Sequence, residues 1–166
     1  MAATPSGSAI VQARLAAALI LGLIILGAVW YGISFESLDR LWKDMLARPG
    51  GPMTFRFILQ PAMAATAAFR DGVEDARIGR TPYILSMLRG VEPRGARLWE
   101  SVVATARILV LGVVMDSIYQ GLVLRTFYPA QAAVIAVLLA LVPYLLLRGP
   151  FERIARHWVA RHPQNS

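Results

Sequence analysis

Three long stretches of this chain carry almost no charge, and this pattern limits the possible folds more than any other feature. They run from about residue 10 to 33, from 101 to 124 and from 130 to 147. A helix of about 20 predominantly apolar residues is long enough to cross a bilayer. The arginines crowd between these stretches, whereas soluble helices distribute charge along their outer faces. The sequence therefore predicts an all-α, polytopic integral membrane protein with three clear spans and a single membrane domain.

The composition excludes several classes of protein. The 166 residues are 57% hydrophobic and 16% charged, and Lys43 is the only lysine in a chain of net charge +7. Because the arginines flank apolar runs, we expect them to meet anionic lipid head groups and not nucleic acid. The chain has no cysteine, and its two histidines, His157 and His162, lie near the C-terminus. We therefore expect no disulfide, no metal centre and no cofactor.

The segment 53–69 is the ambiguous one. It is apolar and rich in alanine, but it is short and contains Arg56, Gln60 and Pro61. A short fourth span, a re-entrant helix and an interfacial helix all fit this pattern. We favour the span, because Arg56 lies near its start, where an arginine can reach the head groups.

Two further segments are amphipathic and are predicted to lie along the membrane surface. The first covers residues 34–48, with Ser34 as its N-cap, and the run from Pro49 to Pro52 ends it. The second is the tail at 150–162, separated from the third span by a break at Arg148-Gly149-Pro150. The side chains expected to anchor these elements at the interface are Trp30, Tyr31, Trp42, Trp158, Arg153 and Arg156.

The arginine distribution sets the expected orientation. The loop at 70–100 and the tail hold most of the arginines, while the turn between the last two spans holds only Arg125. The positive-inside rule places the loop and the C-terminus in the cytoplasm. If 53–69 crosses the membrane, the N-terminus is also cytoplasmic and 34–52 is periplasmic. If it does not, the N-terminus is outside and the whole region 34–100 is cytoplasmic.

Polar residues inside the predicted spans are the candidate functional positions. An ionised Asp116 is costly in hydrocarbon and needs a partner. Arg107 lies on roughly the opposite face of the same helix, whereas Gln120 shares the face of Asp116. We predict an intramembrane polar cluster of Arg56, Gln60, Asp116 and Gln120. It serves either as structural glue between helices or as a proton or ion site, and we favour the glue.

The residues from Asp71-Gly72 to Ala76-Arg77 resemble the signature of the CDP-alcohol phosphotransferases, which use carboxylates to bind magnesium. Gly112 and Asp116 match part of the later half of that signature, but Gln120 stands where its last aspartate belongs. The two halves are also too far apart in the chain. We therefore rank this lipid-head-group enzyme last among the functions considered.

A second resemblance covers most of the chain from Met53 onward. The elements Phe55-Arg56-Phe57…Gln60-Pro61, Asp71 to Tyr83, and Tyr144 to Pro150 are similar to those of a family of small bacterial inner-membrane proteins. This resemblance implies an inner-membrane location and no particular activity.

These observations lead to three functional hypotheses. The first is a non-enzymatic accessory or scaffold subunit of a bacterial inner-membrane complex, with a membrane-protein partner or a second copy of itself. The second is a small oligomeric transporter or channel that uses Asp116. The third is the head-group enzyme described above.

Overall fold

The computed structural model describes residues 5–32, 35–47, 53–83, 85–86, 90 and 93–161. Every regular element within them is helical: α1 (Gly7–Tyr31), α2 (Phe35–Ala47), α3 (Arg56–Arg77), α5 (Arg94–Tyr119), a π-helical turn η2 (Gln120–Leu124) and α6 (Pro129–Arg161). Three of these helical stretches, Gly7–Tyr31, Arg94–Leu124 and Pro129–Val159, are long and apolar enough to cross a membrane. The all-α polytopic fold predicted from the sequence is confirmed.

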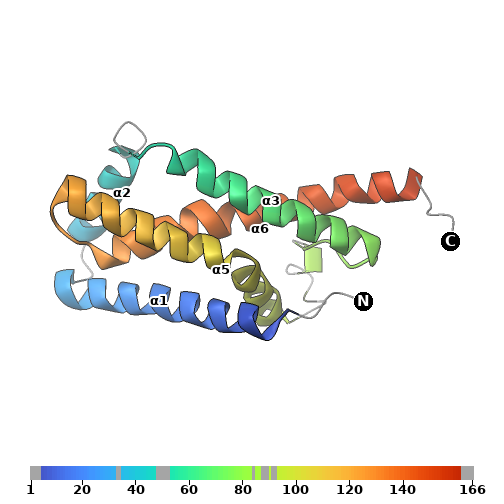
Figure 1. The fold of residues 1–166 in the computed structure, drawn as a ribbon, viewed down its shortest axis with the longest axis horizontal. Helices are drawn as coiled ribbons and strands as arrows, with labels where there is room; N and C mark the ends of the chain where they lie inside the picture. Colours follow the sequence, from blue (N-terminus) through green and yellow to red (C-terminus); the bar gives the residue numbers. More distant parts are fainter. Residues whose placement is uncertain are drawn as a thin grey trace.

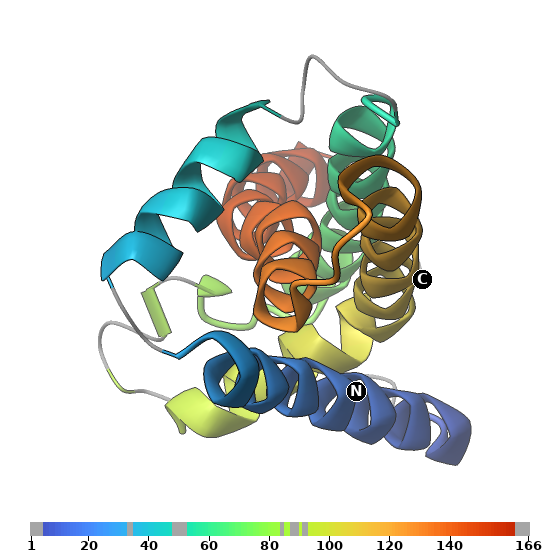
Figure 2. The same ribbon diagram turned by 90° about the vertical axis from the view of Figure 1, so that its left-hand side faces the viewer.

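The long helices alternate in direction. α1 and α5 begin at the end of the molecule that holds both chain termini, whereas α3 and α6 begin at the opposite end (Figure 1). Seen from that opposite end, α3, α5 and α6 form a bundle, α1 crosses beneath it at an angle, and α2 lies to one side (Figure 2). One hydrogen bond agrees with this arrangement, because it joins the end of α1 to the start of α6. The Tyr31 hydroxyl donates to the Phe127 carbonyl, 2.8 Å away, in the turn before α6.

The core of the bundle is built from small residues. Fully buried alanines of α1, α3, α5 and α6 form its centre: Ala13, Ala16, Ala64, Ala68, Ala106 and Ala140. Small side chains let helix backbones approach closely, which is how helices associate where lipid removes the usual hydrophobic driving force. Larger apolar side chains of α1 point outward, among them Leu15, Ile25 and Val29. An alanine core with leucine and valine outside is the arrangement expected of a protein solvated by lipid.

Two boundaries predicted from the sequence are wrong. The region 70–100 was expected to be a loop, but α3 continues to Arg77 and α5 already begins at Arg94. The third span was expected to end at Leu147, with a break at Arg148-Gly149-Pro150, but α6 continues through Pro143 and Pro150 to Arg161. Its backbone packs tightly against α3 there, since a Cβ at Gly72 would lie 3.0 Å from the Arg148 carbonyl oxygen. This packing and the hydrogen bonds on either side maintain the helix despite the missing proline N–H groups.

Residues 56–69 of the predicted segment 53–69 form the first part of α3, and Ser34 and residues 48–52 lie outside the described residues. The outward side chains of this part are mostly apolar, including Phe55, Ile58 and Phe69, whereas its long polar side chains Arg56 and Gln60 are buried. α3 is not among the helices apolar enough to be a candidate span. Five of its six charged residues lie in the stretch from Arg70 to Arg77.

α1 approaches α6 so closely at Gly27 that the structure leaves no room for a side chain there. A methyl group at Gly27 would lie 2.5 Å from the Ala130 Cβ and 2.7 Å from its backbone nitrogen, whereas Gly22 has nothing within 4 Å. We expect Gly27→Ala to lower the free energy of unfolding by about 1–3 kcal/mol, as overpacking does. Gly22→Ala is the matched control and should leave stability unchanged or slightly higher. Unfolding in mixed detergent micelles measures both, and equal stability of the two variants would contradict this packing.

Candidate functional site

The structure brings three of the four residues of the predicted intramembrane cluster into direct contact. Arg56 on α3 donates to Asp116 Oδ1 on α5 at 2.5 Å, and the Gln120 amide donates to Asp116 Oδ2 at 2.6 Å. Their side chains are 2%, 0% and 0% exposed, respectively. Tyr119 completes the enclosure, with its ring 5.1 Å from the guanidinium carbon of Arg56. Both carboxylate oxygens are therefore used within the bundle.

Gln120 also holds the end of α5. Its side-chain oxygen accepts from the Tyr128 backbone N–H at 2.5 Å, and its amide nitrogen lies 3.2 Å from the Tyr128 carbonyl. The helix widens into the π-helical turn η2 at this residue, and Arg125 follows in a left-handed conformation with a φ of 51°. Gln120 thus connects the buried carboxylate to the turn that leads into α6.

The fourth predicted member, Gln60, is 2% exposed and lies against Gly112. A Cβ at Gly112 would be 2.6 Å from the Gln60 amide nitrogen, so the glycine provides the space that this amide occupies. Neither Gln60 Nε2 nor Arg56 Nη1 has a hydrogen-bond partner within the described residues. Gln60 therefore belongs to the same buried layer, but it is packed against Asp116's helix and not bonded to its carboxylate.

A second polar network, which the sequence analysis missed, lies at the other end of the bundle. Arg148 on α6 is 1% exposed and donates to three groups: Asp75 on α3 at 2.8 Å, Glu100 on α5 at 2.6 Å and the Tyr144 hydroxyl at 2.9 Å. The Tyr144 hydroxyl in turn donates to Asp71 at 2.5 Å. One guanidinium therefore joins α3, α5 and α6.

Tyr83, which follows α3, joins the same network. Tyr83 is 1% exposed; its backbone N–H donates to Glu152 at 3.2 Å and its hydroxyl lies 2.6 Å from Ser101 Oγ. Its ring stacks under Arg148, with the guanidinium carbon 4.8 Å from the ring centre. Burial raises the pKa of the Tyr83 hydroxyl, and burial also raises the pKa of Asp75 against the lowering effect of Arg148.

The sequence does contain a signal for this network, because several of its residues are spaced one helical turn apart. Asp71 and Asp75 are four residues apart, as are Tyr144 and Arg148, so each pair shares one face of a helix. They also lie in two of the elements that carry the resemblance described above. The prediction of a loop from residue 70, and of a helix that ends at Leu147, separated these pairs and so concealed their spacing.

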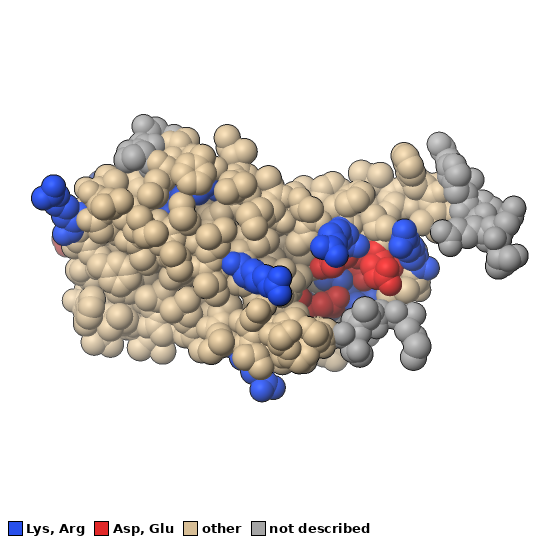
Figure 3. Space-filling view, viewed as in Figure 1, with Lys and Arg blue, Asp and Glu red and all other residues tan. Residues whose placement is uncertain are grey.

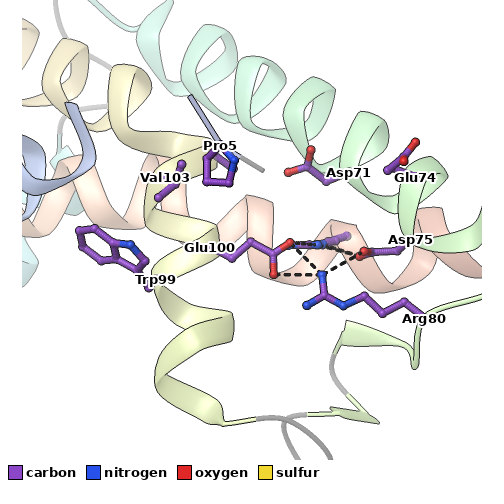
Figure 4. Close-up of a pocket in the computed structure, with 10 residues that line it drawn as sticks. Pro5, Asp71, Glu74, Asp75, Arg80, Trp99, Glu100 and Val103 are labelled. Atoms are coloured by element: carbon purple, nitrogen blue, oxygen red, sulfur yellow. Dashed lines mark hydrogen bonds and ion pairs between the residues drawn. The ribbon is translucent and has the colours of Figure 1, made fainter. Parts of the chain in front are cut away.

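A cavity of about 280 Å³ opens beside the network (Figure 4). Its charged lining comes from α3, the following turn, α5 and α6: Asp71, Glu74, Asp75, Arg80, Glu100 and Arg148. Its apolar lining is Pro5, Trp99, Val103 and Ala104. In the space-filling view, most of the visible acidic atoms gather in this region of an otherwise largely uncharged face (Figure 3).

Some of the predicted interfacial anchors are exposed, and others contact the rest of the protein. Trp30, Trp42 and Trp158 are 56%, 56% and 71% exposed, and Arg153 is exposed on α6. Tyr31 is engaged with the turn before α6, where its ring also lies 4.8 Å from that of Tyr128.

Arg156, expected to face lipid, instead turns back into the protein. Its guanidinium lies 2.5 Å from a carboxylate oxygen of Glu152, which is 0% exposed, and it also donates to the Arg80 carbonyl. The residue therefore joins α6 to the turn after α3.

The geometry does not support a shared magnesium site for the phosphotransferase-like residues. Asp71 lies fifteen positions beyond Arg56 on α3, a rise of about 22 Å, and Arg56 is the residue that contacts Asp116. Among the residues that the structure describes, no three Asp, Glu, His or Cys side chains are grouped so as to hold a metal ion. Asp71 and Asp116 instead belong to two separate networks.

Comparisons with protein-family models, with curated proteins and with solved structures found no match for this chain.

Proposed function

We propose that this protein is a non-enzymatic accessory subunit of a bacterial inner-membrane complex, which it joins through the outer face formed by α1 and α5. Arg107 carries the proposal. It lies within the candidate span of α5, it is exposed, and its Nε donates to the neutral Gln12 side chain of α1 at 3.0 Å. Within the described part of the chain, Arg107 forms no ion pair with a carboxylate.

An arginine in this position is stabilised by an anion on a neighbouring membrane helix. A charged side chain at the centre of a membrane helix costs about 2.5–3.5 kcal/mol on insertion scales, so such residues usually face a partner. The contrast with Arg56 is informative, because that arginine is buried and paired inside the bundle. A carboxylate on a neighbouring membrane helix would compensate Arg107 and specify which subunit binds there.

The buried cluster favours this function over transport. A transported ion must reach its binding group, but Asp116 is 0% exposed and is bonded through both of its oxygens. This arrangement suits a group that holds helices together. Oligomeric transport through Asp116 is the alternative that the following experiment can reveal.

The test is purification of the tagged full chain from native membranes in a mild detergent, with mass measurement of the intact particle and identification of its components. We expect a second polypeptide in a fixed ratio, lost in Arg107→Leu and retained in Arg153→Leu, the matched exposed arginine of α6. Recovery of this chain alone as a monomer would refute the proposal. A defined homo-oligomer would favour the transport alternative.

We further propose that the protein crosses the inner membrane four times, with both termini in the cytoplasm. A three-span arrangement needs α1 and α5 to cross in opposite directions, yet both begin at the same end of the molecule (Figure 1). That end also carries most of the arginines, which the positive-inside rule places in the cytoplasm. α2 and the turn between α5 and α6 would then face the periplasm.

The absence of cysteine from the sequence allows a direct test of this orientation. Lys43 on α2 has a side chain 75% exposed, and Arg153 on α6 is exposed at the opposite end. In intact spheroplasts we expect a membrane-impermeant maleimide to label Lys43→Cys but not Arg153→Cys. Permeabilised cells should label both, which is the control. Protection of Lys43→Cys in spheroplasts would favour three spans.

A further inference from the structure

The cavity beside Arg148 has an excess of negative charge. Four carboxylates line it, from Asp71, Glu74, Asp75 and Glu100, against the two guanidiniums of Arg80 and Arg148. Asp75 and Glu100 are the carboxylates that these arginines bind (Figure 4). Within the described residues, Asp71 accepts a hydrogen bond only from the neutral Tyr144 hydroxyl. Glu74 has no hydrogen bond or ion pair there. Two carboxylates therefore remain for an external cation.

The same cavity has an apolar side. Trp99, Val103 and Ala104 line it from α5, and Pro5 lines it from the segment just before α1. Trp99 is 37% exposed, so this side continues onto the outer surface of the helices. A small inorganic cation would leave the apolar lining without a partner. The lining instead fits a cation attached to an apolar group.

The position of the cavity indicates where such a molecule comes from. It lies near the charged end of the bundle, where α3 has become polar and where α5 begins, beside helices long enough to cross a membrane. Lipid head groups occupy this level, above the apolar part of the spans. A phospholipid could place its head group against the carboxylates and its chains along α5.

The type of cation follows from the acceptors. Carboxylate oxygens accept hydrogen bonds, and a primary ammonium group offers three N–H donors. A quaternary ammonium offers none and is usually held by several aromatic rings. Among the described residues that line this cavity, Trp99 is the one aromatic side chain. Hydrogen bonds to charged groups are the stronger ones. The lining therefore selects a primary ammonium over its methylated counterpart.

We propose that this cavity binds a primary ammonium group, supplied by an aminophospholipid of the surrounding membrane, between Asp71 and Glu74. The inference does not depend on the accessory-subunit proposal, because it concerns the lipid and not a protein partner. A soluble polyamine offers the same ammonium chemistry without the apolar chains, so the test includes both sources.

The experiment is native mass spectrometry of the purified full chain with equimolar phosphatidylethanolamine and phosphatidylcholine of identical acyl chains. We expect at least a fivefold excess of the phosphatidylethanolamine adduct. Glu74→Gln should abolish this excess while keeping the fold, since Glu74 has no partner to lose, and circular dichroism verifies this. Glu36→Gln is the matched control, an exposed glutamate of α2, and should keep the excess.

The remaining outcomes separate the possible sources. Spermidine that binds the wild-type chain and not Glu74→Gln, together with equal adducts of the two lipids, would assign the ammonium site to a soluble amine and overturn the lipid. Equal lipid adducts without spermidine binding would overturn the site itself. A lipid preference that survives in Glu74→Gln would also overturn it, because the preference would then arise elsewhere on the protein.

Discussion

Replacing Asp116 with asparagine is expected to lower the free energy of unfolding by about 3–5 kcal/mol, the usual result of removing one partner from a buried ion pair. The substitution keeps the size of the side chain but leaves the Arg56 guanidinium charged and buried at 2% exposure. Circular dichroism during unfolding in mixed detergent micelles measures the loss. This is the largest effect that we expect from a single neutralised carboxylate.

Two controls make the result specific to the pair. Asp39→Asn removes a carboxylate whose partner, Lys43, is 75% exposed, and such surface pairs contribute about 1 kcal/mol or less. The double substitution Arg56→Met with Asp116→Leu removes both charges and should recover most of the lost stability. Wild-type stability in Asp116→Asn would contradict the ion pair and indicate that Asp116 is protonated.

Replacing Arg148 with leucine should have an effect of similar size at the other end of the bundle. The change would leave Asp75 and Glu100 without their closest cation and remove the donor to Tyr144. We expect a loss of about 3–5 kcal/mol in the free energy of unfolding, again because buried charge is left uncompensated. The same micelle titration measures it.

The matched control lies five residues further along the same helix. Arg153→Leu removes an exposed arginine and should change stability by less than about 0.5 kcal/mol. Arg148→Lys should recover only part of the loss, because an ammonium cannot reproduce the planar fork that reaches three partners on separate elements. Equal stability of the leucine and lysine variants would indicate that the position contributes packing and not charge.

The spans could be predicted from the sequence because their signal is local. Each of the stretches at 10–33, 101–124 and 130–147 is identified by its own uncharged length, whatever it packs against. The proximity of Arg56 and Asp116 could also be inferred, since each occurs in the outer half of its segment and a buried charge needs an opposite one. That inference compared the depths of the two residues in the membrane, and the depth of a residue follows from its position along a predicted span.

The network around Arg148 could not be predicted in the same way. Asp75, Glu100 and Arg148 are far apart in the chain, and two of them lay in a region expected to be a loop. The error came from treating proline and charge as helix-ending signals. Inside a bundle, tertiary packing can maintain a helix that such residues would end in isolation.

By itself, the sequence determined the class of this protein, because apolar length alone decides whether a helix can cross a bilayer. It also determined that Asp116 must find a partner, because hydrocarbon does not solvate an isolated carboxylate. Only the tertiary structure decided which charges are compensated inside the chain, as at Arg56 and Arg148, and which have no ion-pair partner among the described residues, as at Arg107 and Glu74. That division depends on distances between residues on different helices, which local sequence patterns do not specify.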